Sequence, residues 1–136
     1  MIDWVMLVPL VVFSRISGDF SEELKTKYGM TASNFSSVDN ENKNAVFPFV
    51  YVHALPASEV GADLRGDEIN AGMFSFQIDV YDNQSQKRAR EVMAEVIRIM
   101  KTMRFFVNSM PEFSTSGNVH RCTMRVRRVI GAGDIL

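Results

Sequence analysis

Apolar and polar residues alternate most regularly between Met73 and Tyr81, and this alternation predicts a β-strand. One face of such a strand would be apolar and the other polar, as a half-buried strand requires. The residues expected on the apolar face are Phe74, Phe76, Ile78 and Val80, and those on the polar face are Ser75, Gln77 and Asp79. We therefore expect another element to cover one side of this strand.

The segment that begins at Gln86 changes to a three–four spacing of apolar residues, which is typical of an amphipathic helix. Asn83 or Ser85 is expected to cap its N-terminus. The apolar stripe consists of Ala89, Val92, Met93, Val96, Ile99, Met100 and Met103. The residues expected toward solvent are Lys87, Arg88, Arg90, Glu91, Glu95, Arg98 and Lys101. Because strand and helix each have one apolar face, we expect the helix to pack across a sheet and to form the core with it.

A second stripe predicts a helix from about Ile2 to Tyr28. Its members are Val5, Val8, Val12, Ile16, Phe20 and Leu24. Pro9 lies in the first two turns, where it is tolerated, Gly18 is expected to bend or break the helix, and Gly29 is expected to end it.

The apolar run from Trp4 to Phe13 also invites comparison with a signal peptide or a membrane span. Asp3 stands where a signal peptide carries positive charge, and a bilayer requires about 20 apolar residues. A buried helix, or a helix docked on a partner, is the preferred interpretation.

Two further strands are predicted before the central one, at Met30–Val38 and at Val46–Leu55, with a polar turn at Asp39–Asn44 between them. Pro48 cannot donate to a strand ladder, so an edge or a bulge is expected there. Both faces of Val46–Leu55 are apolar, which indicates cover on both sides or contact with a neighbouring subunit.

The segment from Pro56 to Gly72 is much longer than the two to five residues of an ordinary hairpin loop. We interpret it as an arm that becomes ordered against a partner, and a solvated loop is the alternative. After the second helix, Phe105–Gly117 is expected to be an irregular connection. The last strand is expected at Val119–Ile130, where core-facing residues alternate with basic ones. The core-facing set is His120, Cys122, Met124, Val126 and Ile130, and the opposite set is Arg121, Thr123, Arg125 and Arg127.

The predicted fold class is therefore α+β, with the element order helix, strand, strand, strand, helix, strand. We expect a mixed, mainly antiparallel four-stranded sheet with two helices packed on it and a long arm between the second and third strands. Residues 1–136 are expected to form a single domain, which is an ordinary size for one.

Composition adds few constraints on function. Hydrophobic residues make up 46% and charged residues 23% of the chain, and the formal net charge is −1, so general polyanion binding is not indicated. With Cys122 as the single cysteine, no internal disulfide can form.

No pattern of an active site stands out. His120 and Cys122 share a strand face, but two ligands are too few for a metal site, so a buried thiol and a hydrogen-bonded histidine are preferred. No nucleophile elbow, phosphate loop or dinucleotide fingerprint occurs. A basic contact face is expected from Arg121, Arg125, Arg127 and Arg128. These arginines would bind phosphates or be neutralised by Asp79 and other acids, and neutralisation is preferred.

Several segments together carry a resemblance to a known family. They are the apolar N-terminal helix, FPFVYVHAL at Phe47–Leu55, the long polar excursion, FSFQIDVYDNQSQKRAREVMAEVIRIM at Phe74–Met100, and VHRCTMRVRRVIG at Val119–Gly131. In this arrangement the chain resembles phage tail terminator proteins, also called tail-completion proteins, of the lambda gpU-like family. The likeness covers most of the chain from Phe47 to Gly131.

The resemblance implies a structural virion assembly protein and not an enzyme, without cofactor, metal or membrane. Members form a homo-oligomer, a hexameric ring, on the head-proximal end of the tail tube. The ring stops tube polymerisation and meets a head–tail connector or stopper protein. DNA passes through it without sequence-specific binding. The implied location is the tail–neck region of the virion, after assembly in the host cytoplasm.

Such a ring requires head-to-tail interfaces that close. The residues expected at subunit or tube interfaces are Phe47, Phe49, Tyr51, Val60, Leu64, Arg65, Asp67 and Glu68. Two other interpretations stay open. One is another head–tail junction protein, such as a connector or stopper. The other is a small ligand-binding or enzymatic α+β domain, which a defined apolar pocket with convergent polar groups would favour.

Overall fold

The computed structural model describes residues 3–37, 46–61 and 70–136. Within these ranges the helices are α1 (Asp3–Gly18), α2 (Glu22–Tyr28), the short 3-10 helix η1 (Ala32–Asn34) and α3 (Gln86–Thr102). The strands are β1 (Phe35–Ser36), β2 (Phe49–Ala54), β3 (Ser58–Val60), β4 (Ala71–Asp82), β5 (Phe106–Ser116) and β6 (Val119–Gly131).

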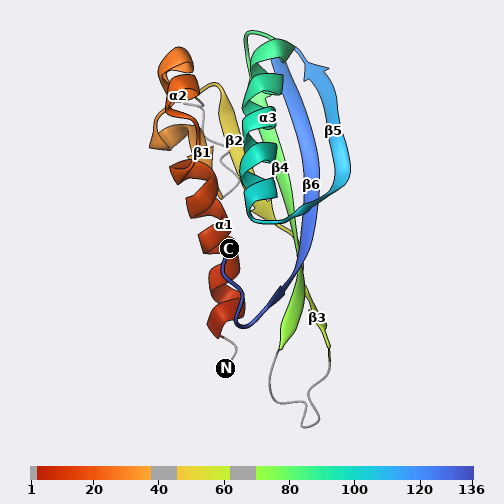
Figure 1. The fold of residues 1–136 in the computed structure, drawn as a ribbon. Coiled ribbons are helices and arrows are strands. Elements are labelled where there is room, and N and C mark those ends of the chain that lie inside the picture. The colour runs from red at the N-terminus through yellow and green to blue at the C-terminus, as the bar shows by residue number, and fades with distance from the viewer. Residues whose placement is uncertain (1–2, 38–45, 62–69) are drawn as a thin grey trace.

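The strands form one mixed sheet in the order β1-β2-β4-β6-β5, and β3 pairs with one end of β4 (Figure 1). The pairing of β1 with β2 is parallel, and the remaining pairings are antiparallel. This confirms the predicted α+β class and the mainly antiparallel sheet. The prediction of four strands and two helices was wrong in detail, because the described residues form six strands and three α-helices.

Helix α3 packs on the sheet as its apolar stripe predicted. Val96 and Ile99 are fully buried, and Phe76 and Ile78 of β4 are buried in the same core. Ser85 caps the helix, because its hydroxyl oxygen accepts a hydrogen bond from the Arg88 amide at 3.1 Å. The prediction that Glu95 faces solvent was wrong, because this residue is only 8% exposed.

The N-terminal segment is two helices and not one. α1 and α2 meet at an angle of 69° after Gly18. Ser21 caps α2 through its side chain, and the backbone amide of Ser21 donates to the Glu95 carboxylate at 2.8 Å. Gly29 ends α2 in the left-handed conformation, as predicted. The bend expected at Gly18 is therefore a break that a carboxylate of α3 holds in place.

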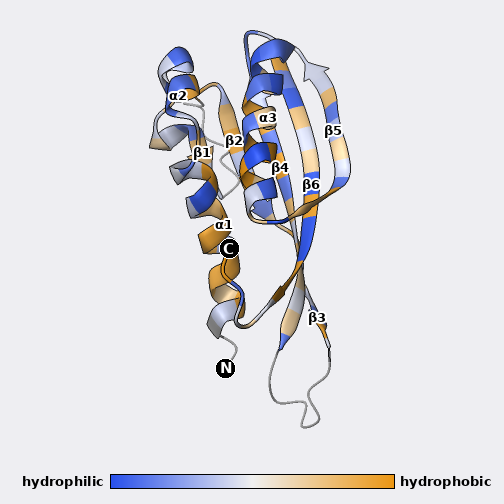
Figure 2. Ribbon diagram, in the orientation of Figure 1, coloured by the Kyte–Doolittle hydropathy of each residue, from blue (hydrophilic) through white to orange (hydrophobic). Residues whose placement is uncertain are grey.

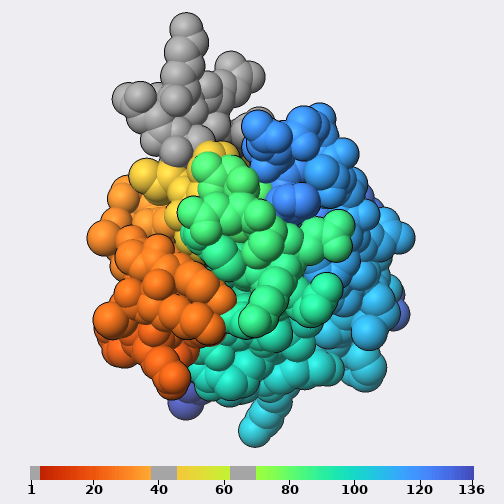
Figure 3. All heavy atoms as spheres, turned by 90° about the horizontal axis from the view of Figure 1, so that it is seen from above, coloured from red at the N-terminus to blue at the C-terminus, as the bar shows by residue number. Residues whose placement is uncertain are grey.

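The two helices of this bent segment differ in character. Figure 2 shows the lower turns of α1 in hydrophobic colours and α2 mostly in hydrophilic ones. Residues Val8, Val12, Ile16 and Phe20 of the predicted stripe are buried. On α2, the Tyr28 hydroxyl donates to Glu91 of α3, and this hydrogen bond lowers the pKa of the Glu91 carboxylate. Figure 3 views the end of the molecule where α2, the start of α3 and the turn between β5 and β6 lie side by side.

The strand predicted at Met30–Val38 is reduced to the two residues of β1. The Asn34 side chain accepts from the Thr31 amide and donates to the Pro48 carbonyl, so the chain turns through η1 first. The predicted turn at Asp39–Asn44 lies outside the described residues. β2 begins at Phe49, directly after Pro48, which has no amide proton to donate.

The connection after α3 is a strand and not an irregular segment. Phe105–Gly117 was expected to be irregular, but β5 runs for 11 residues and pairs with β6. Its register with β6 shifts on either side of Ser109, and most of its side chains are exposed. An edge strand with such irregularities shows no clear alternation in the sequence.

Candidate assembly surfaces

The face of the sheet opposite the helices carries polar and aromatic side chains. At its centre lies Asp79, which is only 2% exposed although no described helix covers it. Its carboxylate accepts hydrogen bonds from Arg121 at 3.1 Å and from Thr123 at 2.6 Å. Gln77 connects the same cluster to Arg125, whose Nε donates to the Gln77 carbonyl oxygen at 3.1 Å. Neutralisation by Asp79 is therefore confirmed for Arg121 only. Arg125 binds the Gln77 amide instead, and Arg127 has no ion pair with another described residue.

The predicted basic face is smaller than expected. Arg121, Arg125 and Arg127 share this side of β6, whereas Arg128 points to the helix side, in step with Val126 and Ile130. Its guanidinium donates to the Met103 carbonyl at 3.0 Å and lies 3.4 Å from Asp134. Grouping Arg128 with the other three was wrong, because the period of two along the strand places it on the opposite side.

The β2 residues expected at an interface lie on the same polar and aromatic face, except that Phe47 precedes the strand. Phe49 pairs with Tyr81 at a ring separation of 6.4 Å, and Tyr51 stacks on His53 at 5.5 Å. All are half-buried in the isolated chain. The structure thus brings Phe49 and Tyr51 together with the Asp79 cluster on one surface.

The arm has a defined base. β3 pairs with the start of β4, at the end of the sheet that continues past α3 and β5 (Figure 1). All three β3 residues are exposed, including Val60 at 37%. Describing Pro56–Gly72 as one long loop was therefore wrong at its ends. Leu64, Arg65, Asp67 and Glu68 lie outside the described residues.

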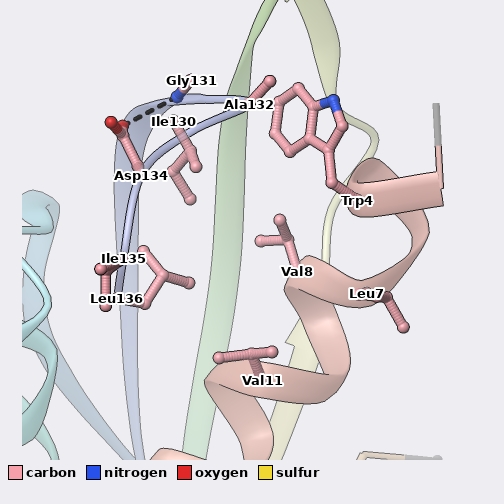
Figure 4. A pocket seen from close by; sticks show the side chains of 10 residues that line it. All are labelled: Trp4, Leu7, Val8, Val11, Ile130, Gly131, Ala132, Asp134, Ile135 and Leu136. Atoms are coloured by element: carbon pink, nitrogen blue, oxygen red, sulfur yellow. Dashed lines mark hydrogen bonds between the residues drawn. The ribbon is translucent and has the colours of Figure 1, made fainter. Parts of the chain in front are cut away.

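A further apolar surface follows α1. Met6 is 76% exposed and Leu10 is 61% exposed. On the neighbouring side of the helix, a cleft of about 340 Å³ opens between α1 and the C-terminal residues (Figure 4). Trp4 and Val8 line it from α1, and Leu136 lines it from the chain end. The Asp134 carboxylate beside it already accepts from the Gly131 amide at 2.8 Å, so few polar groups converge on the cleft.

The residues with reactive side chains show no constellation typical of catalysis. No group of three metal-ligating side chains lies close together in the described part of the chain. Cys122 is fully buried, and burial raises the pKa of its thiol to about 11. His120 forms a hydrogen bond with Thr115 at 3.1 Å. The interpretation of these two residues as a buried thiol and a hydrogen-bonded histidine is confirmed.

The sequence pointed to the arm and to the aromatic strand, but it missed two surfaces. The exposed side of α1 gave a signal, since Met6, Leu7 and Leu10 lie off the predicted stripe and are apolar. The second surface lies beside the start of β5, where Phe106 is 71% exposed; it gave no signal, because that strand was not predicted.

No family model matches the sequence, and no curated protein was found to match it. No single helix of the described ranges is long and apolar enough to cross a membrane, although α1 and α2 pass that test when counted together.

Proposed function

We propose that this chain is a structural phage assembly protein of the tail terminator type. It forms a ring, most simply a hexamer, that ends the tail tube, joins it to the head–tail connector and lets DNA pass. The sequence resemblance to tail terminators suggests this role, and the surfaces of the domain are compatible with it.

The observation that carries the proposal is the exposed strand at the base of the arm. β4 continues beyond the part of the sheet that α3 covers and pairs there with β3. The three β3 residues are exposed, so β3 adds no buried core to its own domain. A segment without core contacts costs conformational entropy to order, and contacts with a partner would offset that cost.

The exposed side of α1 supports the same role. Met6, Leu7 and Leu10 are each more than half exposed on one helix. Contiguous apolar residues on a surface are typical of protein–protein contact. The cleft beside α1 supports a ligand-binding domain less well, because Asp134 is already bonded within the chain.

The test is a tube-capping assay with an arm variant. Residues Ala57–Asn70 are replaced by a short Gly-Ser turn, and the control keeps the full length but exchanges 62–69 for Gly and Ser. We expect both variants to fold. The short variant removes β3, whose residues are all exposed, and the control leaves β3 in place. We expect the short variant to leave tubes over-long. The control has the full arm length but lacks the native side chains of 62–69, so it shows whether capping requires those side chains or only the length of the arm.

Normal tube length and normal infectivity with the short arm would refute the role. An isolated monomer or a two-fold dimer in the particle would refute the ring. A protein that binds capsids but leaves tube ends uncapped would identify a connector or stopper instead.

A further inference from the structure

The outer edge of β6 is free at one end of the sheet. β5 pairs with β6 from Val119 only as far as Arg127, whereas β4 pairs with β6 to Gly131. In the described part of the chain no strand continues beside the last four residues of β6 on the β5 side. Figure 1 shows β6 continuing past the point where β5 begins. We call this place the β6 step.

The step forms an open cleft of about 450 Å³. Its lining residues are Met73, Arg104, Phe106, Arg127, Arg128 and Val129. Phe106 is 71% exposed and Val129 is 46% exposed, so the cleft has an apolar surface that the isolated chain leaves uncovered.

Positive charge surrounds this apolar surface. Arg128 is occupied by Met103 and Asp134, but the exposed side chains of Arg104 and Arg127 have no hydrogen bond or ion pair with another described residue. The Lys101 ammonium lies 5.6 Å from the centre of the Phe106 ring. The arginines suit a ligand that carries carboxylates, and the apolar surface suits one that carries apolar side chains. The free edge of β6 suits a ligand in extended conformation, because such a segment can pair with it as an added strand.

We propose that the β6 step binds the arm, residues 58–70, of a second copy of this chain. This inference rests on the proposed ring. The arm sequence SEVGADLRGDEIN contains four acidic residues, Glu59, Asp63, Asp67 and Glu68, against the single basic Arg65. It also contains Val60, Leu64 and Ile69. Four acids and one arginine give the arm a net charge of −3, whereas that of the whole chain is −1, so the arm complements the arginines of the step.

The position of the two surfaces agrees with a ring. β3, from which the arm leaves, lies on one side of β4, whereas the step lies beyond β6 on the other side. Donor and acceptor are therefore different surfaces on opposite sides of the same strand pair. Contacts between unlike surfaces are head-to-tail, and they close into a ring when the rotation permits.

The first test is binding of a labelled peptide, residues 57–71, to the folded chain, followed by fluorescence anisotropy at low salt. We expect saturable binding that weakens roughly tenfold in Arg104→Glu/Arg127→Glu and recovers with a peptide whose four acids are changed to lysine. Arg104→Gln/Arg127→Gln removes the charges without reversing them. The matched control is Arg125→Glu on the same strand and face, which we expect to stay within about twofold of wild type.

The second test uses full chains that carry the reversed arm or the reversed step. Each alone should fail to form rings in native mass spectrometry, and a mixture of the two should restore them, because every contact then pairs opposite charges. If rings form only from a single chain that carries both reversals, and not from the mixture, the arm binds the step of its own chain. That result would overturn the inference.

Two other results would also overturn it. One is absence of saturable binding at roughly 1 mM peptide. The other is arginine-dependent binding of a DNA duplex of about 20 bp without any effect on the peptide. Normal tube capping by Arg104→Glu/Arg127→Glu would refute this contact alone. Peptide binding with the expected charge dependence, but no capping by wild type, would refute the proposed function alone.

Discussion

The Glu95 carboxylate joins α3 to the break between α1 and α2, next to the hydrogen bond from Arg98 to the Asp19 carbonyl, and its removal should destabilise the fold measurably. It accepts from the Ser21 amide at 2.8 Å and from Arg98 at 2.7 and 2.8 Å. A hydrogen bond to a charged group contributes about 1.5–3 kcal/mol. The Arg98 side chain is 56% exposed, so its ion pair adds about 0–1 kcal/mol at most.

These values give the expected size of two substitutions. Glu95→Gln keeps an acceptor for the Ser21 amide but loses the charge, and should lower the free energy of unfolding by about 1–2 kcal/mol. Glu95→Leu leaves the part-buried Ser21 amide without an acceptor and should lower the free energy of unfolding by about 2–3 kcal/mol.

The effect should depend on pH in a defined direction. Hydrogen bonds from Arg98, and next the Ser21 amide, hold the pKa of Glu95 below its ordinary value of 4.5 despite the opposing effect of burial. Since the folded pKa is the lower one, the stabilisation is complete above about pH 4.5 and is lost as the pH falls through the folded pKa. The difference between wild type and Glu95→Gln should therefore shrink on acidification.

Urea unfolding followed by circular dichroism, at neutral pH and down to about pH 3, measures this difference. Glu22→Gln is the control, because its carboxylate is 86% exposed and 3.7 Å from Lys25. We expect a change below about 0.5 kcal/mol for that control. A loss of less than about 0.5 kcal/mol in Glu95→Gln at neutral pH, or a loss that is the same at about pH 3, would refute the reasoning.

Two other predictions concern the core. Val96→Asp places an unpaired charge at a fully buried position, so we expect a loss of about 4 kcal/mol or more in urea unfolding. A folded variant of near-normal stability would contradict the packing of α3. The Cys122 thiol, buried and with its pKa raised to about 11, should react with a thiol reagent at mildly alkaline pH roughly 100-fold more slowly than in the unfolded chain. Equal rates would show that the thiol is accessible.

The sequence predicted the elements whose side-chain period is strong. The alternation of β4 and the stripe of α3 were read correctly, because one face of each lies in the core. β5 was missed, since it is an edge strand with shifted register and exposed side chains on both faces. Its pairing is supplied by β6, which a local pattern does not reveal.

The sequence also did not predict which charged side chains are buried. Glu95 was predicted to face solvent, and its partner Ser21 lies 74 positions away along the chain. The pairing of Asp79 with Arg121 was predicted, but the near-complete burial of Asp79 was not. Arg128 is different, because counting in steps of two from Val126 already gave its side of the strand. The candidate surfaces on β2 and the arm were anticipated, whereas the β6 step depended on a strand that the sequence did not show.

The packing of α1 has a consequence for the order in which the protein is made. Val8, Val12 and Ile16 are buried against a core that includes α3, which ends at Thr102. At about 5–20 residues per second, translation from Gly18 to Thr102 takes roughly 4–17 s, and during this time the apolar helix lacks its final cover on the ribosome. Met6 and Leu10 stay exposed even afterwards. The apolar side of α1 therefore stays uncovered until α3 has been synthesised, and the helix that packs against it begins only at Gln86.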